Sequence, residues 1–296
     1  MFGRLSLLLT TFAVLALTAC SAPTSAQVPT FVPPPAATDA GARYIKAAAG
    51  APSIRAASYL LVDANSGVPI VARNADVVRG VASTQKLITA MVVLDQGNLD
   101  KRITIKASDL NVEPTRLGVR AGETYTRRQL LYAFLIKSAN DVAKVLARDA
   151  AGSEAAFVGL MNAKARSLGM SASYFANPHG LSQRGQHSTA RDMARAALMA
   201  YRNPIIRDAV RQKYYTFRFA SGRTITLSNT NNLLGRMPEC NGMKTGYTDA
   251  AGRCLISSAS SGGRAVILVQ LGTKTKFIWD DARVLMTWGL RQVNRG

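Results

Sequence analysis

The spacing of apolar and polar residues changes twice along this chain. Residues 58–63 and 68–74 are short apolar runs separated by Asn65-Ser66-Gly67, which is typical of a β-hairpin. Apolar residues then recur with helical spacing, and Thr189 with Asp192 resembles a capping box. The predicted helices span residues 83–96, 127–137, 141–149, 154–168 and 190–202, and a further helix begins at Asn203-Pro204.

Beyond residue 213 the pattern returns to that of strands. The predicted strands span residues 214–220, 224–227, 242–247, 254–260 and 265–271, and a helix over residues 277–292 follows them. Strands at both ends with helices between them favour an α+β fold. We expect one antiparallel sheet flanked by helices, with a helical subdomain inserted in the middle, and a folded domain over residues 53–296.

The first 52 residues do not fit this domain and predict export. Residues 1–19 combine a basic start with an apolar run too short to span a bilayer, as in a secretory signal peptide. They lead into Leu17-Thr18-Ala19-Cys20, which resembles a bacterial lipobox in which Cys20 is acylated and becomes the new N-terminus. An ordinary signal peptide is the alternative. Residues 20–52 are rich in Ala, Pro, Ser and Thr and are predicted to form a flexible, lipid-anchored tether.

The charge balance fits a protein of the cell envelope. The chain has 37 Lys+Arg against 17 Asp+Glu, a formal net charge of +20, and a basic protein attracts anionic partners. Because export separates it from nucleic acid, we expect a location in the envelope or periplasm, at a membrane through Cys20. The remaining cysteines, Cys240 and Cys254, either form a disulfide in this oxidising compartment or remain two free thiols.

Three short motifs, each present once, point to the chemistry. Ser83-Thr84-Gln85-Lys86 is an S-x-x-K, Ser138-Ala139-Asn140 is an S-x-N, and Lys244-Thr245-Gly246 is a K-T-G. An S-x-x-K arises by chance about once in a chain of this length, so a single motif carries little information. In this order, the three form the motif set of penicillin-binding proteins and the related β-lactamases.

The S-x-x-K motif supplies a nucleophile and a base. Ser83 begins the helix predicted over residues 83–96, and Lys86 lies on the same face, with about 5–6 Å between the Cβ atoms. A serine hydroxyl becomes nucleophilic when a neighbouring base removes its proton. Lysine is that base only when it is neutral, which requires burial or a nearby cation. Lys244 is the candidate for this cation.

The S-x-N and K-T-G motifs are predicted to handle the substrate. Ser138 is expected to relay a proton to the leaving amine, and Asn140 to hold either the substrate amide or Lys86. Lys244 and Thr245 are expected to bind a substrate carboxylate because the lysine is cationic and the threonine donates a hydrogen bond.

Backbone groups complete the predicted site. Gly246 is expected to leave a strand edge open, so that a peptide pairs beside it. The backbone N–H groups of Ser83, at a helix start, and of Tyr247 are the candidates for an oxyanion hole.

Longer stretches of the sequence resemble a known family. Four segments look like the serine D-alanyl-D-alanine carboxypeptidases, which are low-molecular-mass penicillin-binding proteins: residues 81–90, 177–181, 187–193 and 242–248. The resemblance extends over residues 56–290 and implies a penicillin-binding transpeptidase/β-lactamase-like fold, acyl-enzyme chemistry and no cofactor. It also implies peptidoglycan peptides ending in D-Ala-D-Ala as substrates and β-lactams as acylating agents. Ala139 departs from the glycine that is common at the centre of the S-x-N motif.

Three other functions remain open at this point. An endopeptidase of the same fold cuts D-alanyl cross-links, although Asn177-Pro178-His179-Gly180 favours the carboxypeptidases. A β-lactamase is disfavoured because no glutamate lies in the E-x-x-x-N context of the class A enzymes. A catalytically inert wall-binding lipoprotein explains the charge but not the three motifs. His179 and His187 fit neither a Ser-His-Asp triad nor a zinc site, so no metal is predicted and both histidines are assigned structural roles.

Overall fold

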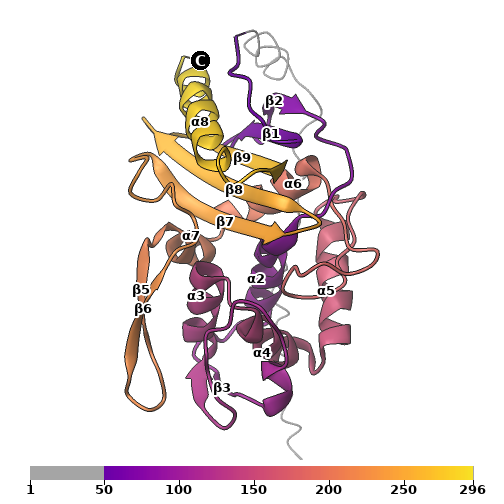
Figure 1. Cartoon of the computed structure of the whole chain (residues 1–296), viewed down its shortest axis with the longest axis vertical. Coiled ribbons are helices and arrows are strands. Elements are labelled where there is room, and N and C mark those ends of the chain that lie inside the picture. Colours follow the sequence, from indigo (N-terminus) through magenta and orange to yellow (C-terminus); the bar gives the residue numbers. More distant parts are fainter. Residues whose placement is uncertain (1–49, 296) are drawn as a thin grey trace, which may run out of the picture. The chain divides into compact units, whose positions relative to one another are not determined.

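The computed structural model describes residues 50–295, and a five-stranded antiparallel sheet joins the two ends of this part of the chain (Figure 1). Its strands lie in the order β2-β1-β9-β8-β7. In chain order they are β1 (Ser58–Asp63), β2 (Pro69–Arg73), β7 (Cys240–Thr248), β8 (Gly252–Ser261) and β9 (Arg264–Thr273). β1 pairs with β9 along its whole length, which confirms the prediction of one antiparallel sheet shared by both ends of the chain.

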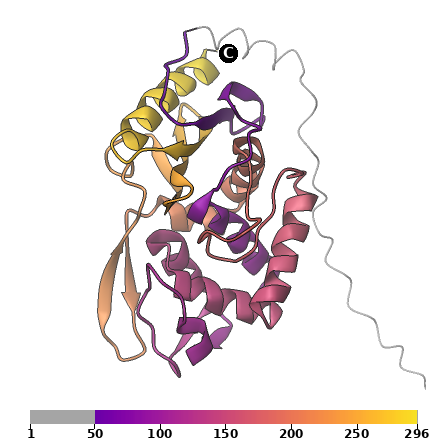
Figure 2. The ribbon, with the colours of Figure 1, turned by 45° about the vertical axis from the view of Figure 1, so that its right-hand side comes forward.

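Helices cover both faces of this sheet, which accounts for the apolar run in β9, where Gln270 is the single polar residue between residues 265 and 271. α8 (Ile278–Asn294) packs against β8 and β9, and α6 (Ala190–Arg202) packs against β9 and β1 on the other side (Figure 2). Residues 265–271 of β9 are therefore all buried. Burial on both faces removes the polar alternation that marks a half-exposed strand.

The helical region surrounds one buried helix, α2 (Lys86–Asp95), whose first eight residues are all buried. Its neighbours are α3 (Arg127–Lys137), α4 (Asn140–Ala151), α5 (Glu154–Ser167) and α6. A helix that is apolar all round is typical of such a central position. The predicted bounds of α3 and α6 are confirmed, and those of α4, α5 and α8 differ by one or two residues.

Two helix starts show local detail beyond the apolar pattern. α7 (Pro204–Arg211) begins with proline as predicted, and Asn203 caps it. The Thr189 hydroxyl accepts a bond from the Asp192 N–H at 3.1 Å, as expected at the start of α6. The Asp192 carboxylate, however, accepts bonds from the Ala172 N–H and the Ser173 hydroxyl, at 2.9 and 2.8 Å. The predicted capping box is therefore only half formed, because a tertiary contact takes the second bond.

Two small hairpins lie outside the main sheet. The predicted hairpin at residues 214–227 is confirmed as β5 (Tyr214–Arg218) and β6 (Thr224–Ser228). The other hairpin was not predicted and consists of β3 (Arg102–Thr104) and β4 (Thr124–Thr126), with the 3-10 turn η2 (Ala107–Leu110) between them. Strands of three residues are too short for an alternating pattern to be recognised.

The sequence predictions for the N-terminal segment concern residues that the structure does not describe. The signal peptide over residues 1–19, Cys20 and the tether up to residue 49 all lie outside the described residues. Within residues 50–295, no helix is both long enough and apolar enough to cross a bilayer.

Candidate active site

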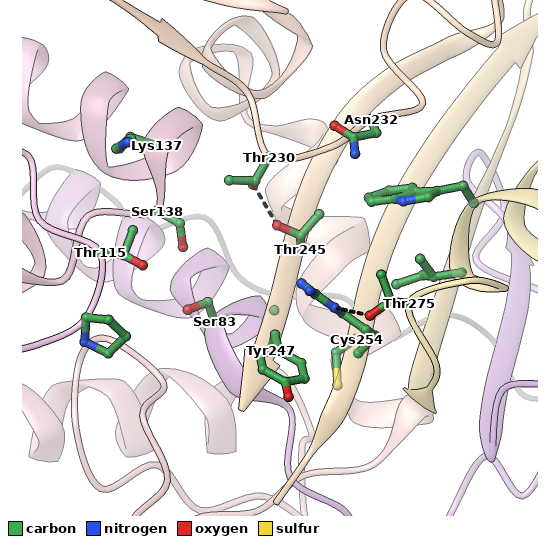
Figure 3. Close-up of a pocket in the computed structure, with 15 residues that line it drawn as sticks. Ser83, Thr115, Lys137, Ser138, Thr230, Asn232, Thr245, Tyr247, Cys254 and Thr275 are labelled. Carbon is green, nitrogen blue, oxygen red and sulfur yellow. Dashed lines mark hydrogen bonds between the residues drawn. The ribbon is translucent and has the colours of Figure 1, made fainter. Parts of the chain in front are cut away.

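A cleft of about 420 Å³ lies between the helical region and β7 at the edge of the main sheet (Figure 3). Residues of all three motifs line it: Ser83, Ser138, Thr245 and Gly246, together with Tyr247. The side chains of Ser83, Ser138 and Thr245 come from three different elements and surround the same space in Figure 3. The fold thus brings together the three motifs that the sequence keeps far apart.

Ser83 lies in the tight 3-10 turn η1 (Ala82–Gln85), so α2 begins three residues later than predicted. Ala82 has a positive φ of 47°, a conformation that residues other than glycine rarely adopt. The Thr84 hydroxyl and N–H both donate to the Val81 carbonyl, at 2.6 and 3.2 Å, and stabilise the turn. Because the turn precedes the buried helix, Ser83 is only half-buried and faces the cleft.

Lys86 is fully buried directly behind Ser83. Its Nζ lies 2.8 Å from Ser83 Oγ and 2.7 Å from Asn140 Oδ1, and it also bonds to the backbone carbonyl of His179. A neutral amine has two hydrogens and one lone pair. The two hydrogens suit the Asn140 and His179 oxygens, which leaves the lone pair for the Ser83 hydroxyl. The site thus has the geometry of a serine with its base.

The electrostatics of the site favour the neutral form of Lys86. Burial and, second, the charge of Lys244 lower the pKa of Lys86 well below its ordinary value of 10.5. Lys244 is itself fully buried on β7, where its Nζ donates to the Thr245 carbonyl at 3.0 Å, and burial lowers its pKa to about 7. Among the described residues, neither lysine has a carboxylate within ion-pair distance. The predicted influence of Lys244 on Lys86 is therefore present.

The S-x-N motif occupies the junction between α3 and α4. Ser138 ends α3 with a left-handed φ of 65°, and α4 begins at Asn140 two residues later. The Asn140 amide Nδ2 donates to the Pro114 carbonyl at 2.6 Å, and its backbone N–H donates to the Thr115 carbonyl at 2.8 Å. These bonds orient Oδ1 towards Lys86. Of the two partners predicted for Asn140, the structure shows Lys86.

The K-T-G motif lies on β7, which is the edge strand of the main sheet. The Thr245 hydroxyl donates to the hydroxyl of Thr230 at 2.6 Å. Thr230 also lines the cleft, and no sequence motif indicated it. At Gly246, a Cβ atom would lie 2.8 Å from the backbone nitrogen of Ser83. The glycine thus allows β7 to touch η1, a role in addition to the predicted open strand edge. Tyr247 follows with its side chain 50% exposed.

A loop over residues 177–181 closes the site from the helical side, and its role was not predicted. The His179 carbonyl accepts a bond from Lys86 and lies 3.2 Å from Ser83 Oγ. Gly180 has a φ of +89°, and a Cβ atom there would lie 2.4 Å from the Ala82 carbonyl oxygen. The Asn177 side chain holds the loop, since its Oδ1 accepts from the Gly180 N–H at 2.7 Å. These functions use backbone atoms, which sequence motifs do not report.

The imidazole of His179 is structural, in agreement with the sequence prediction. It is buried, and its Nδ1 accepts a bond from the Leu181 N–H at 3.3 Å. Burial, followed by the charges of Lys86 and Lys144, lowers the pKa of His179 to about 3. The ring is therefore neutral at physiological pH, and the Glu154 carboxylate at 3.8 Å from Nε2 faces an uncharged N–H.

The suggested disulfide between Cys240 and Cys254 is wrong. Both cysteines are free and buried. Cys240 pairs with Ala259 at one end of the β7–β8 ladder, and Cys254 pairs with Gly246 towards the other end. Six positions along a strand correspond to about 20 Å, whereas a disulfide needs Cα atoms closer than about 7 Å. The register of the hairpin, which the sequence does not reveal, separates the two thiols.

Comparison with known proteins places this geometry in a family. The model of the Peptidase S11 family, described as D-alanyl-D-alanine carboxypeptidase, matches residues 45–275. The D-alanyl-D-alanine carboxypeptidase DacB2 of Mycobacterium tuberculosis (strain ATCC 25618 / H37Rv) is 33% identical over 240 residues, which is 79% of this chain and 82% of that protein. A D-alanyl-D-alanine endopeptidase of Escherichia coli (strain K12) is 36% identical over 251 residues, or 81% of this chain and 79% of that protein.

The solved structures agree with the sequences. The crystal structure of a D-alanyl-D-alanine carboxypeptidase from Mycobacterium tuberculosis H37Rv superposes with a TM-score of 0.78 at 32% identity, covering 81% of this chain and 93% of the other. The predicted penicillin-binding fold is thereby confirmed. Since the family model matches well over half of the sequence, this chain belongs to the Peptidase S11 family of D-alanyl-D-alanine carboxypeptidases.

Proposed function

We propose that this protein is a serine D-alanyl-D-alanine carboxypeptidase that removes the terminal D-alanine from peptidoglycan stem peptides, and that β-lactams acylate it. One observation carries the proposal. The Nζ of Lys86 lies 2.8 Å from Ser83 Oγ, is fully buried, and has a strongly lowered pKa. A serine beside a neutral amine is an activated nucleophile.

The reaction begins with transfer of the Ser83 proton to Lys86. Ser83 Oγ then attacks the carbonyl carbon of the penultimate D-alanine, and the backbone N–H groups of Ser83 and Tyr247 stabilise the oxyanion. The peptide C–N bond breaks when the leaving amine takes up a proton, which Ser138 relays from Lys86. Water hydrolyses the resulting ester, again with Lys86 as base, and releases the shortened peptide and free Ser83.

The substrate is held on both sides of this centre. Asn140 positions Lys86, and Gly246 lets the β7 edge approach the nucleophile closely enough for a peptide to pair beside it. Thr245 faces the cleft beside Thr230 and binds the substrate carboxylate together with the charge of Lys244. A β-lactam carries the equivalent carboxylate, and its opened ring stays attached and keeps water away, so its ester is long-lived.

Turnover of a muropeptide mixture tests the function against its alternatives. Mass spectrometry monitors both reactions. We expect the release of D-alanine from a pentapeptide to be faster than the cleavage of a cross-linked dimer. The reverse order indicates the endopeptidase, a function favoured by the 36% identity to the Escherichia coli endopeptidase. Rapid loss of a fluorescent penicillin label indicates a β-lactamase, and the absence of labelling indicates an inert wall-binding lipoprotein.

A pH prediction follows from the two buried lysines. Activity requires neutral Lys86, so the acylation rate rises as the pH increases through the lowered pKa of Lys86. Lys244→Met removes the positive charge that contributes to this lowering. We therefore expect the acid limb of the profile of second-order acylation rate against pH to move to higher pH in this variant. Lys137→Met, which removes a cation from the same cleft, is expected to leave the limb in place; an unmoved limb in Lys244→Met contradicts the coupling.

We also propose that the mature protein begins at a lipidated Cys20 and is anchored to a membrane of the cell envelope. The support is the Leu17-Thr18-Ala19-Cys20 sequence behind an apolar run, followed by the Ala/Pro-rich segment. Two or more acyl chains anchor a protein stably, whereas one chain gives marginal binding. Cys20→Ala is expected to move the protein from the membrane pellet to the soluble fraction, as detected by immunoblotting. Retention of this variant in the pellet contradicts the lipid anchor.

A further inference from the structure

One guanidinium group in the cleft has no role in the reaction described above. Arg253 lies on β8 directly opposite Tyr247 of β7, and both residues line the cleft. The centre of its guanidinium lies 4.3 Å from the centroid of the Tyr247 ring, and its Nε donates to the Thr275 hydroxyl at 3.0 Å. The stacking and the hydrogen bond fix this flexible side chain in one position.

The position of Arg253 brings it within reach of the carboxylate site. Thr245 and Tyr247 are two residues apart on β7, so their side chains lie on the same face of the sheet. Arg253 is the cross-strand partner of Tyr247 and therefore a diagonal neighbour of Thr245. Diagonal neighbours lie about 7–8 Å apart, which a long side chain easily spans.

The charge environment leaves Arg253 available for an anion. Among the described residues that line the cleft, Lys137 and Arg253 are cationic and none is acidic. The nearby Asp249 is bonded to the Tyr247 phenol at 2.7 Å, and among the described residues Arg253 has no ion-pair partner. With Nε bound to Thr275, the four terminal N–H groups remain to form the planar fork that matches a carboxylate.

Lys244 does not supply an equivalent group at the surface of the cleft. It is fully buried, its Nζ donates to the Thr245 carbonyl, and burial depresses its pKa. Its charge therefore acts on the cleft from behind the strand, whereas the guanidinium of Arg253 is permanently charged and only half-buried.

We propose that Arg253, fixed by Tyr247 and Thr275, is the specificity-determining residue that recognises the free C-terminal carboxylate of the substrate. This inference rests on the proposed carboxypeptidase function. It assigns two parts to carboxylate recognition: Arg253 makes the bidentate contact together with Thr245, and Lys244 provides the field and lowers the pKa of Lys86.

A matched pair of peptides tests this assignment. The substrates are diacetyl-L-Lys-D-Ala-D-Ala and the same peptide with a C-terminal carboxamide, and kcat and KM are measured by mass spectrometry of the released amine. Arg253→Gln is expected to raise KM for the carboxylate peptide about ten- to a hundredfold, the effect of losing a charge-assisted contact. Turnover of the carboxamide is expected to stay unchanged, which also shows that the variant is folded.

Further variants distinguish the bidentate hydrogen bonding of the Arg253 guanidinium from the effect of its positive charge. Arg253→Lys keeps the charge without the fork and is expected to recover only part of the affinity, while Thr275→Val is expected to raise KM moderately by freeing the side chain. Arg264→Gln removes an exposed charge at the far end of β9 and is expected to leave both substrates unaffected. An unchanged ratio of carboxylate to carboxamide turnover in Arg253→Gln overturns the assignment. Failure of the proposed function is a different result, in which the wild type releases neither D-alanine from the carboxylate peptide nor D-alaninamide from the carboxamide peptide and is not labelled by penicillin.

Discussion

Replacing Ser83 with alanine is expected to abolish both penicillin labelling and release of D-alanine. The variant keeps the cleft and Lys86 but has no atom that can form the ester. Removal of the nucleophile from a serine hydrolase typically lowers kcat by about 10⁶-fold, so the remaining activity falls below the detection limit of most assays. Fluorescent penicillin on a denaturing gel and D-alanine release from a pentapeptide measure the two losses.

Two further measurements make this prediction specific. Ser167→Ala, which removes an exposed serine hydroxyl on α5, is expected to retain full labelling and activity. Peptide mapping of the wild-type penicillin adduct is expected to place the added mass on Ser83. An adduct on Ser138, the other motif serine in the cleft, would falsify the proposed assignment of the nucleophile.

Much of the fold was predictable because burial leaves a direct trace in the sequence. β9 lies between α8 and α6, and its buried stretch over residues 265–271 contains a single polar residue, Gln270. α2 is enclosed by four other helices, and its buried residues after Lys86 are apolar apart from Thr89. In both elements burial on all sides requires apolar residues, so the apolar composition of the sequence predicted that a buried strand or helix lies there. The pair β3 and β4 lacks this trace because each strand has only three residues.

The sequence predicted the parts of the candidate site that are formed by side chains. It did not predict the parts that depend on backbone conformation. Ser83, Lys86 and Asn140 meet as the motif order indicated, and the charge of Lys244 acts on Lys86, because each motif specifies the side chains that it contributes. The left-handed conformation of Ser138 is imposed by the junction of α3 and α4, and no propensity of serine predicts it. The disulfide suggestion failed for a related reason, since pairing register depends on contacts along the whole hairpin.

The backbone part of the site leads to a second prediction of large effect, for Gly180→Ala. Gly180 has a φ of +89°, which strains any residue with a side chain, and a Cβ atom would lie 2.4 Å from the Ala82 carbonyl oxygen and 2.8 Å from the Ser83 nitrogen. Both neighbours are backbone atoms of η1 and cannot rotate away. The loop and the turn must therefore separate by about 1 Å to restore van der Waals contact.

This separation is expected to affect catalysis more than folding. It moves the Ser83 N–H and Oγ relative to Lys86, and it moves the adjacent His179 carbonyl that holds the Lys86 amine. A displacement of 1 Å at a reacting centre typically costs about 100-fold in rate. We expect the acylation rate of Gly180→Ala, measured by stopped-flow with a fluorescent penicillin, to fall by about this factor, while thermal unfolding shows a protein that is still folded.

Gly185 provides the matched control because it separates the backbone strain of a positive φ from the steric clash of a new Cβ atom with η1. It lies in the same loop region with a φ of +84°, but a Cβ atom there would meet nothing closer than the Tyr174 ring at 3.9 Å. Gly185→Ala therefore carries a similar conformational strain, about 1–2 kcal/mol, without displacing η1. We expect it to lower the melting temperature slightly and leave the acylation rate at the wild-type value. Equal losses of acylation rate in the two variants would show that backbone strain in the loop, and not the contact of Gly180 with η1, determines the activity. A loss in Gly180→Ala alone shows that the missing side chain of Gly180 allows the loop to approach η1 closely enough for the His179 carbonyl to bond to Lys86.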